Sequence, residues 1–443
     1  MTSALKFGLA RAALVAALGL VAVSPASAAD LGGNCCADLE ERIAELEATT
    51  ARKGNRKVSL EISGHVNEAI LAWDDGVESN AGVYTNDNAR SRFRFRGDAK
   101  ITGDWKAGYL LEIGVRSQNS KRFTQFDPGA DAGGDDNGLD VRHSTWWIGS
   151  KTYGKLWVGL TGGASEGVTE TNLSATKDVL KYSDVEDTGL GLQALVDGVY
   201  TDMQWRRLIR GGGDQPGEVR RHNLVRYDTP ELAGFMGTVN WGEDDAWEVG
   251  LRYKGEMGDF KLAAAIAYGE STESSANTAF QCVGNNVSGT DPAVVGVPDA
   301  RCNQLGGSVS VMHKSGIYAN FAAGYMEDEA LATDPGFGGG LLDDKSNFYA
   351  GEVGIEQKWN TLGKTTIFGQ YYLNEGGSQD RSFRTGASNL DGKGGDSQGD
   401  IVSSELESFG AGIIQGIESA DMSVYLIYRH TTGDVTAGAV PAT

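Results

Sequence analysis

The sequence predicts an all-β fold, an antiparallel up-and-down β-barrel that crosses a membrane, with a short helix before it. Apolar and polar residues alternate with a period of two along most of the chain, as in strands whose two faces meet different surroundings. Short and long connections between these runs also alternate, which is typical of an up-and-down barrel. The chain has 63 glycines and 8 prolines in 443 residues, and glycine is tolerated better in bent strands and turns than in helices.

The charge balance excludes one large class of function. The chain carries 60 Asp and Glu against 39 Lys and Arg, a formal net charge of −21. Because binding to nucleic acid requires a cationic face, we expect no nucleic-acid partner.

The N-terminus has the three parts of a secretory signal, which we assign to residues 1–28. Lys6 and Arg11 provide the positive start, residues 12–23 are apolar, and residues 25–28 form an A-x-A type cleavage site. No later run of 18 or more apolar residues follows, so the exported chain can cross a membrane only as a barrel.

Residues 29–57 form a separate segment on the periplasmic side of the predicted barrel, which spans residues 58–443. Leu39, Ile43 and Leu46 have coiled-coil spacing within a predicted helix over 38–51. Two heptads are too short to be stable alone. The helix therefore either associates with other copies or a partner, or frays.

Period-two runs define fifteen predicted strands. In the run that starts at Phe260, for example, Leu262, Ile266 and Tyr268 share one face. The strands are 58–73, 91–103, 105–117, 142–151, 154–161, 219–228, 235–243, 246–256, 259–270, 306–314, 317–327, 347–359, 363–374, 404–417 and 420–431.

The connections predict two different rims. Those after even-numbered strands are short. Those after odd-numbered strands are long, except at 244–245, and comprise 74–90, 118–141, 162–218, 271–305, 328–346 and 375–403. We therefore expect tight turns at one end of the barrel and large loops at the other.

The size of the barrel decides which face lies inside. A ring of fifteen or sixteen strands is too wide for side chains to fill, so its interior holds water. The charged face, with residues such as Arg92, Glu112 and Glu248, then lines the interior. The apolar face is expected to contact outer-membrane lipid, with aromatic residues near the strand ends.

The four cysteines agree with an oxidising compartment. Cys282 and Cys302 flank one long loop, and we expect a disulfide between them. The state of Cys35 and Cys36 does not follow from the sequence. No ligand pairs with zinc spacing are present, and the acidic segment 127–140 does not match a calcium loop, so we predict no metal site and no cofactor.

Three segments resemble the general porins of Gram-negative bacteria. Residues 221–235 (RHNLVRYDTPELAGF) are similar to a strand–turn–strand signature of that family, and residues 91–101 (SRFRFRGDAKI) resemble its second strand. Residues 33–64 resemble the opening of alphaproteobacterial members. The resemblance implies a sixteen-stranded barrel in the cell outer membrane, a homotrimer, and a passive channel for small hydrophilic solutes and ions.

The resemblance also implies that the third long loop, 162–218, folds into the channel and narrows it. Its acidic residues would then face a row of arginines on the wall, and opposed rows of charge would set ion preference. Alternatively, the acids only solvate an exposed loop and the arginines pair with neighbouring strands. The candidate residues are Glu166, Glu170, Asp178, Asp184, Glu186 and Asp187 on the loop and Arg92, Arg94 and Arg96 on the wall.

One feature departs from the family pattern. Family members end in an aromatic residue on the last strand, whereas this sequence ends AGAVPAT, without an alternating run after Thr431. Fifteen is also an odd number of strands. We expect that a sixteenth strand is missing, either because the sequence is incomplete or because its reading frame shifted; otherwise the N-terminal region must close the barrel.

Two other functions are considered. Ser165 lies in a G-x-S-x-G pattern at 163–167, which would suit an outer-membrane lipid hydrolase, but no amphipathic helix follows it and chance matches are expected among so many glycines. The second alternative is a structural barrel that the 38–51 helix tethers to periplasmic partners or to the cell wall. The sequence favours a channel that is not an enzyme.

Overall fold

The computed structural model describes residues 4–6, 57–126, 138–196, 198–209, 215–242, 245–272, 279–282, 301–329, 343–376, 382–385 and 396–438. The predicted helix 38–51, Cys35 and Cys36, and most of the predicted signal segment lie outside the described residues. No helical segment in the described part of the chain is long and apolar enough to cross a bilayer.

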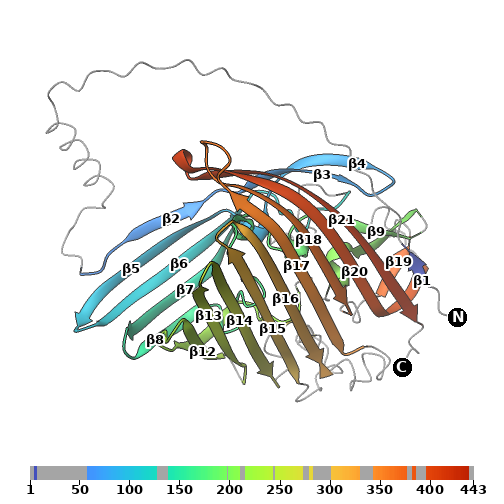
Figure 1. Ribbon diagram of the computed structural model, residues 1–443. Coiled ribbons are helices and arrows are strands. Elements are labelled where there is room, and N and C mark those ends of the chain that lie inside the picture. The colour runs from blue at the N-terminus through green and yellow to red at the C-terminus, as the bar shows by residue number, and fades with distance from the viewer. Residues whose placement is uncertain are drawn as a thin grey trace, which may run out of the picture.

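Fifteen strands form the curved antiparallel wall of the described residues, and four short strands given below join the same sheet (Figure 1). Each strand pairs with the next along the chain, so the predicted up-and-down order is confirmed. The strands are β2 (Glu61–His65), β5 (Arg92–Thr102), β6 (Trp105–Arg116), β7 (Gly138–Ser150), β8 (Gly154–Thr161), β11 (His222–Asp228), β12 (Phe235–Gly242), β13 (Trp247–Met257), β14 (Phe260–Ser271), β15 (Cys302–His313), β16 (Ile317–Asp328), β17 (Lys345–Gln357), β18 (Thr365–Glu375), β20 (Asp396–Ile417) and β21 (Met422–Gly438).

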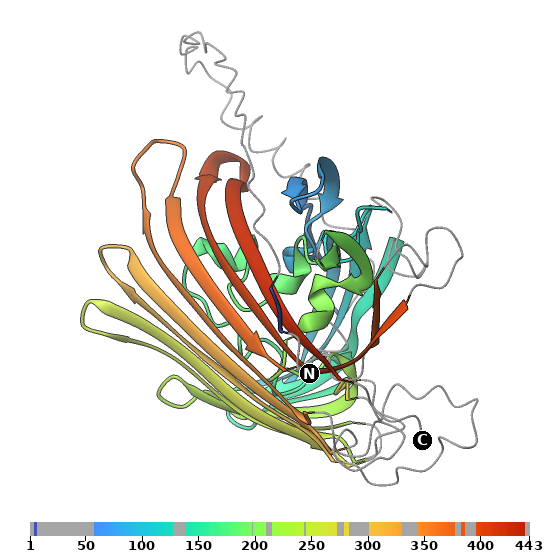
Figure 2. The same cartoon turned by 90° about the vertical axis from the view of Figure 1, so that its right-hand side faces the viewer.

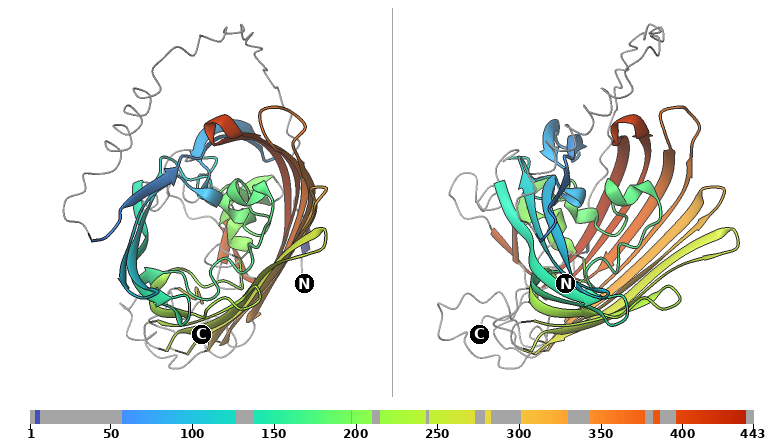
Figure 3. Two further views of the ribbon diagram at one scale, coloured as in Figure 1. Left: turned by 60° about the vertical axis from the view of Figure 1, so that its left-hand side comes forward. Right: turned by 90° about the vertical axis from the view of Figure 1, so that its left-hand side faces the viewer.

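The sheet curves around a central space, and β2 and β21 are its two ends (Figure 3). These two strands are not paired with each other in the described residues, and β1 (Ala4–Lys6) pairs with β21 instead. A side chain connects the two ends of the sheet: Tyr425 of β21 donates its hydroxyl to Asn67 Oδ1 at 2.8 Å and accepts from Asn86 Nδ2 at 3.1 Å.

The two faces of the sheet differ as the alternation predicts. Val353 is 64% exposed on the outer face, whereas its neighbour Glu352 is 1% exposed on the inner face. Other apolar side chains share the outer face, including Leu251, Ile266 and Phe321. Because the polar face turns inward and a broad apolar face turns outward, the sheet has the sidedness of a membrane barrel.

The first predicted strand is wrong in one respect. Residues 58–73 do not form one strand but two, β2 and β3 (Glu68–Asp74), and β3 pairs with β4 (Ser79–Thr85) in a separate hairpin. The break occurs at Asn67, whose backbone N–H donates to Ser91 Oγ at 2.9 Å and whose side chain donates to the Ala89 carbonyl at 3.1 Å. These bonds take the chain out of the main sheet.

The long loops contain more regular structure than predicted. Three additional strands lie in them, β9 (Gln193–Val196), β10 (Val199–Gln204) and β19 (Ser382–Thr385), and β10 pairs with both others. The strand predicted to end at Thr431 continues to Gly438, because residues 431–438 pair with β20 although they lack an apolar alternation. Short 3-10 helices are η1 (Asp87–Ala89), η2 (Ala175–Asp178), η3 (Val185–Asp187), η4 (Trp205–Leu208) and η7 (Glu418–Ala420).

Candidate functional site

The long connection 162–218 between β8 and β11 lies on the inner side of the curved sheet (Figure 2, green). Its first part is held by inward polar side chains of the sheet. The backbone N–H of Ala164 donates to Asn240 Oδ1 at 2.6 Å, and that of Ser165 donates to Glu248 Oε2 at 2.8 Å. The loop therefore turns into the barrel directly after β8.

The middle of the loop crosses the inner faces of β15 and β17. The backbone N–H groups of Thr171 and Leu173 donate to Ser308 Oγ and Ser310 Oγ, both at 3.0 Å. The hydroxyl of Thr176 donates to Glu352 Oε1 at 2.7 Å. Side chains on the wall thus replace the backbone partners that this extended segment would find in a sheet.

The last part of the loop packs through apolar contacts. Leu208 and Ile209 are fully buried in a cluster with Phe348, Tyr372 and Leu406, which belong to β17, β18 and β20. Burial of such side chains contributes roughly 1.5–3 kcal/mol each, so the loop is fixed against this side of the barrel.

The opposite wall carries a row of arginines that share one carboxylate. Glu112 of β6, with a side chain 1% exposed, accepts from Arg94 Nε at 2.6 Å and Arg142 Nε at 2.8 Å, and lies 3.4 Å from Arg92 Nη1. These residues come from the adjacent strands β5, β6 and β7. One buried anion therefore orients three guanidinium groups.

The same wall has a second group of ion pairs closer to the long-loop rim. Asp87 lies 3.0 Å from Arg90 Nε and 2.8 Å from Arg116 Nε. Lys121 Nζ lies 2.9 Å from Asp187 of the long loop, so this group also links the wall to the loop.

A cavity of about 1500 Å³ lies between the loop and the arginine row. All six predicted acidic residues line it, and so do Arg92 and Arg94. Arg96, the third predicted arginine, is exposed and does not line this cavity. The loop acids that line the cavity are Glu166, Glu170, Asp178, Asp184, Glu186 and Asp187.

Several of these acids have cationic partners on their own side of the cavity. Lys181 Nζ lies 2.6 Å from Glu170 and 3.1 Å from Asp184. Glu166 forms an ion pair with Arg221, which immediately precedes β11. The two rows are therefore opposed in space, but the acidic row is partly neutralised locally.

The loop carboxylates differ in how readily they ionise. Burial acts to raise the pKa of Glu166, but the neighbouring Arg221 guanidinium outweighs it and lowers that pKa to about 2. Burial raises the pKa of Asp184 to about 6, and burial together with the charge of Asp184 raises the pKa of Glu218 to about 7. Glu218 also lines the cavity and accepts from the backbone N–H groups of Gly167 and Thr169 at 2.8 and 2.7 Å.

Sequence reasoning missed four residues of this site. Arg142 had no apparent partner, because the residues that it contacts come from other strands. Arg221 stands in the quoted 221–235 segment, and Glu218 lies at the end of the loop next to it. Glu112 was assigned to the inner face, but not as the shared partner of the arginines.

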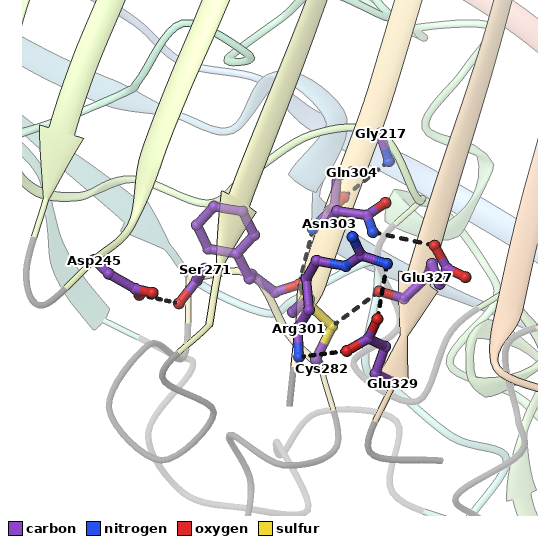
Figure 4. Close-up of a disulfide and its surroundings, with 11 residues drawn as sticks. Gly217, Asp245, Ser271, Cys282, Arg301, Asn303, Gln304, Glu327 and Glu329 are labelled. Atoms are coloured by element: carbon purple, nitrogen blue, oxygen red, sulfur yellow. Dashed lines mark hydrogen bonds and ion pairs between the residues drawn. A yellow bond between two sulfur atoms is a disulfide. The ribbon is translucent and has the colours of Figure 1, made fainter. Parts of the chain in front are cut away.

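The predicted disulfide between Cys282 and Cys302 is present (Figure 4). It ties residues 279–282 to the start of β15, while residues 283–300 lie outside the described residues. Beside it, Gln304 donates to the Phe280 carbonyl at 2.8 Å and accepts from the Gly217 N–H at 2.8 Å (Figure 4). The disulfide therefore supports the end of the long loop.

Ser165 attaches the start of the 162–218 loop to the barrel wall. It is 1% exposed, its hydroxyl donates to Glu248, and it accepts from the Val219 N–H at 2.9 Å. No group of His, Cys, Asp and Glu suited to a metal ion occurs among the residues with a described position.

Solved structures similar to the chain include a loop-deletion mutant of OmpT, an outer membrane protein of Vibrio cholerae (13% identity, 86% of this chain and 99% of that one, TM-score 0.46). Others are an anion-selective porin from Comamonas acidovorans (13%, 86% and 98%, 0.44) and Salmonella typhi OmpF in complex with daunomycin (13%, 86% and 98%, 0.42). No curated protein matched the sequence.

The sequence model of the Gram-negative porin family matches residues 12–436, nearly the whole chain. This match agrees with the up-and-down sheet, its inward polar face and the loop folded inside it. The chain therefore belongs to the family of Gram-negative porins.

Proposed function

We propose that this outer-membrane porin is a passive, water-filled channel for small hydrophilic solutes and ions, and that the 162–218 loop sets its narrowest part. The observation that carries the proposal is the cavity of about 1500 Å³ between the loop and the arginine row. Its lining is charged on both sides, which suits the passage of water and polar solutes rather than apolar ones.

The channel needs no chemical step. Selection would come from the width of the opening and from the field between loop carboxylates and wall arginines. The charge of the whole chain favours cations at the mouth, whereas the arginines favour anions within.

A homotrimer is proposed as the assembly, as the family resemblance implies. Support comes from one similar structure, OmpT of Vibrio cholerae, which is described as a trimer form. Chemical crosslinking of the detergent-solubilised protein should give a ladder that ends at three subunits.

Conductance tests the channel. The full-length protein, folded in detergent and added to a planar bilayer, should give discrete current steps. If protein with the β-sheet circular dichroism of a folded barrel leaves the bilayer silent, the channel proposal is wrong.

A double variant tests the part played by the loop. Ser308→Ala with Ser310→Ala removes the acceptors of two loop N–H groups, each worth about 1–3 kcal/mol when left unpaired. We expect noisier open-channel current because the loop is held less firmly. Ser144→Ala, on the exposed face of β7, is the control and should behave as wild type.

The two alternatives have less support. The hydrolase alternative requires a reactive Ser165, whereas its hydroxyl is buried between Glu248 and the Val219 N–H. The tethering alternative depends on the helix 38–51, which lies outside the described residues.

A further inference from the structure

Two tryptophans face the interior of the barrel on the side of the short turns. Trp147 of β7 and Trp157 of β8 are directly paired across the strands, with ring centroids 6.0 Å apart and planes inclined by 50°. The adjacent Trp146 is 51% exposed on the outer face, so the alternation places Trp147 inside. A water-filled interior gives such rings no apolar surroundings.

The position of this pair along the channel is fixed by the strand. Trp147 follows Arg142 along β7 toward the short turn at 151–153, and lies roughly 15 Å beyond it at about 3.3 Å a residue. The pair is therefore outside the cavity between loop and arginine row. A solute that has passed that cavity meets it next.

A glycine on the neighbouring strand makes room for the Trp147 indole. Gly108 of β6 is the direct neighbour of Trp147, and a Cβ atom at Gly108 would lie 2.7 Å from its indole. The indole thus lies against the strand backbone.

A lysine is held over both rings. Lys155 Nζ lies 4.2 Å from the centroid of Trp147 and 4.7 Å from that of Trp157. Cation–π contacts of this kind keep the ammonium group in place without a direct ion pair.

The nearby carboxylates already have partners. Asp228 forms an ion pair with Arg226 at 2.8 Å and accepts from the Trp157 indole N–H at 2.9 Å. Asp98 is paired with Lys106 at 2.8 Å. Within the described residues no carboxylate lies at ion-pair distance from Lys155, so its positive charge is available to a solute.

We propose that Trp147, Trp157 and Lys155 form a binding site for planar organic anions, such as aromatic carboxylates, below the constriction. Both tryptophans are partly exposed, and the part of each ring that Lys155 does not cover offers a surface for stacking, while Lys155 offers a partner for the anionic group. Organic cations are disfavoured by the same charge, and a neutral flat solute uses the rings alone. This inference rests on the proposed channel, through which the solute reaches the site.

Benzoate is a suitable probe because it is flat and anionic. Two similar compounds separate these two properties: cyclohexanecarboxylate is anionic but not flat, and benzyl alcohol is flat but neutral. In single-channel recordings of the full-length protein, each compound is added from the side of the short turns. Benzoate should block the current at a lower concentration than either of the other two compounds.

Substitutions assign the effect to the site. Trp147→Ala and Trp157→Ala should each raise the half-blocking concentration of benzoate by about fivefold, the equivalent of one lost stacking contact. Lys155→Gln should remove the preference for benzoate over benzyl alcohol. Trp146→Ala is the matched control, and it should leave block unchanged because its indole lies on the outer face.

Two results would overturn the site: equal block by benzoate and cyclohexanecarboxylate in the wild type, or equal effects of Trp146→Ala and Trp147→Ala. A channel that does not conduct contradicts the proposed function instead. In that case, calorimetric titration of the detergent-solubilised protein with benzoate tests the binding site. A heat of binding that is absent in Trp147→Ala but present in Trp146→Ala supports the site. No heat of binding with the wild type rejects it. If Trp147→Ala does not fold, Trp157→Phe and Lys155→Gln serve in the same comparison.

Discussion

Glu112 controls more of the arginine row than its single charge suggests. Its carboxylate contacts Arg92, Arg94 and Arg142 at once, and it is hidden from solvent behind them. Without it, three like charges on adjacent strands would repel one another and lose their common orientation. Glu112 is therefore a positioning residue for the basic side of the channel.

Replacing Glu112 with Gln should make the channel more selective for anions. An ion passing roughly 8 Å from a removed charge in water gains or loses about 0.5 kcal/mol, which changes its local concentration roughly twofold. The reversal potential in a KCl gradient measures this shift.

Glu352→Gln is the matched control for that substitution. Glu352 is equally buried on an inward strand face, but its partners Thr176, Asn320 and Gln370 are neutral. If both variants shift the reversal potential equally, net charge alone matters and the positioning role is wrong.

Glu218 makes the charge and the stability of the loop depend on pH. Its carboxylate holds the N–H groups of Gly167 and Thr169, and it interacts electrostatically with Asp184 and Arg252. Because its pKa is raised to about 7, the ionised form carries a cost in stability above pH 7. That cost declines as the pH falls from about 7 to 4.5, the ordinary glutamate value, below which the carboxyl is protonated in both the folded and the unfolded state.

Lowering the pH from 8 to 5 should therefore reduce cation selectivity. Glu218 becomes neutral as the pH falls through about 7, and Asp184 follows near 6. Reversal potentials at several pH values measure the change. Glu218→Gln should abolish the part between pH 8 and 6.5, and an unchanged profile in this variant would contradict the assignment.

Some residues of the site could be predicted and others could not, for a physical reason. Arg92 and Arg94 follow from strand alternation, which depends only on local sequence. Arg142 and Arg221 depend on which strands become neighbours and on where the loop turns, and both are long-range properties. Arg96 shares the alternation, but it lies too far along β5 toward the short turn to line the cavity.

At the scale of elements, the paired strands were predictable and the loop structure was less so. Alternation is readable only where apolar residues mark one face, and it fails at 431–438, where the paired residues are mostly small or polar although Val435 is buried. The β9–β10 hairpin did have a signal, because an Asp-Gly pair at 197–198 is typical of a tight hairpin turn. The break at Asn67 depends on partners more than twenty residues away.

The disulfide makes a prediction at this scale. Cys282→Ser should lower the free energy of unfolding by about 3 kcal/mol, because the bond closes a loop with a sequence separation of 20. Urea unfolding in detergent, followed by tryptophan fluorescence, measures the loss. Reduced wild type should match the variant, and reductant should not destabilise the variant further.

The whole molecule is organised by its two unlike surfaces. Outward apolar side chains occur on strands all around the sheet, and inward polar ones contact the loop or line the cavity. Lipid is the surrounding that satisfies the first surface while water satisfies the second.

Val353→Arg tests this sidedness. Val353 is 64% exposed near the middle of β17, and a charge on the lipid face costs about 2–4 kcal/mol at the bilayer centre. Folding into lipid vesicles, followed by the shift of the folded band on a gel, should be impaired. Val353→Leu keeps the apolar surface and should fold normally, and normal folding of Val353→Arg would place this face in water.

The loop that crosses the interior also has a mechanical consequence. It is bonded to β13, β15 and β17 through Glu248, Ser308 and Glu352, and it packs on β18 and β20. Lateral tension in the bilayer that flattened the barrel would have to stretch or break these links. We therefore expect the cross-section to keep its shape under load, with the loop acting as an internal brace.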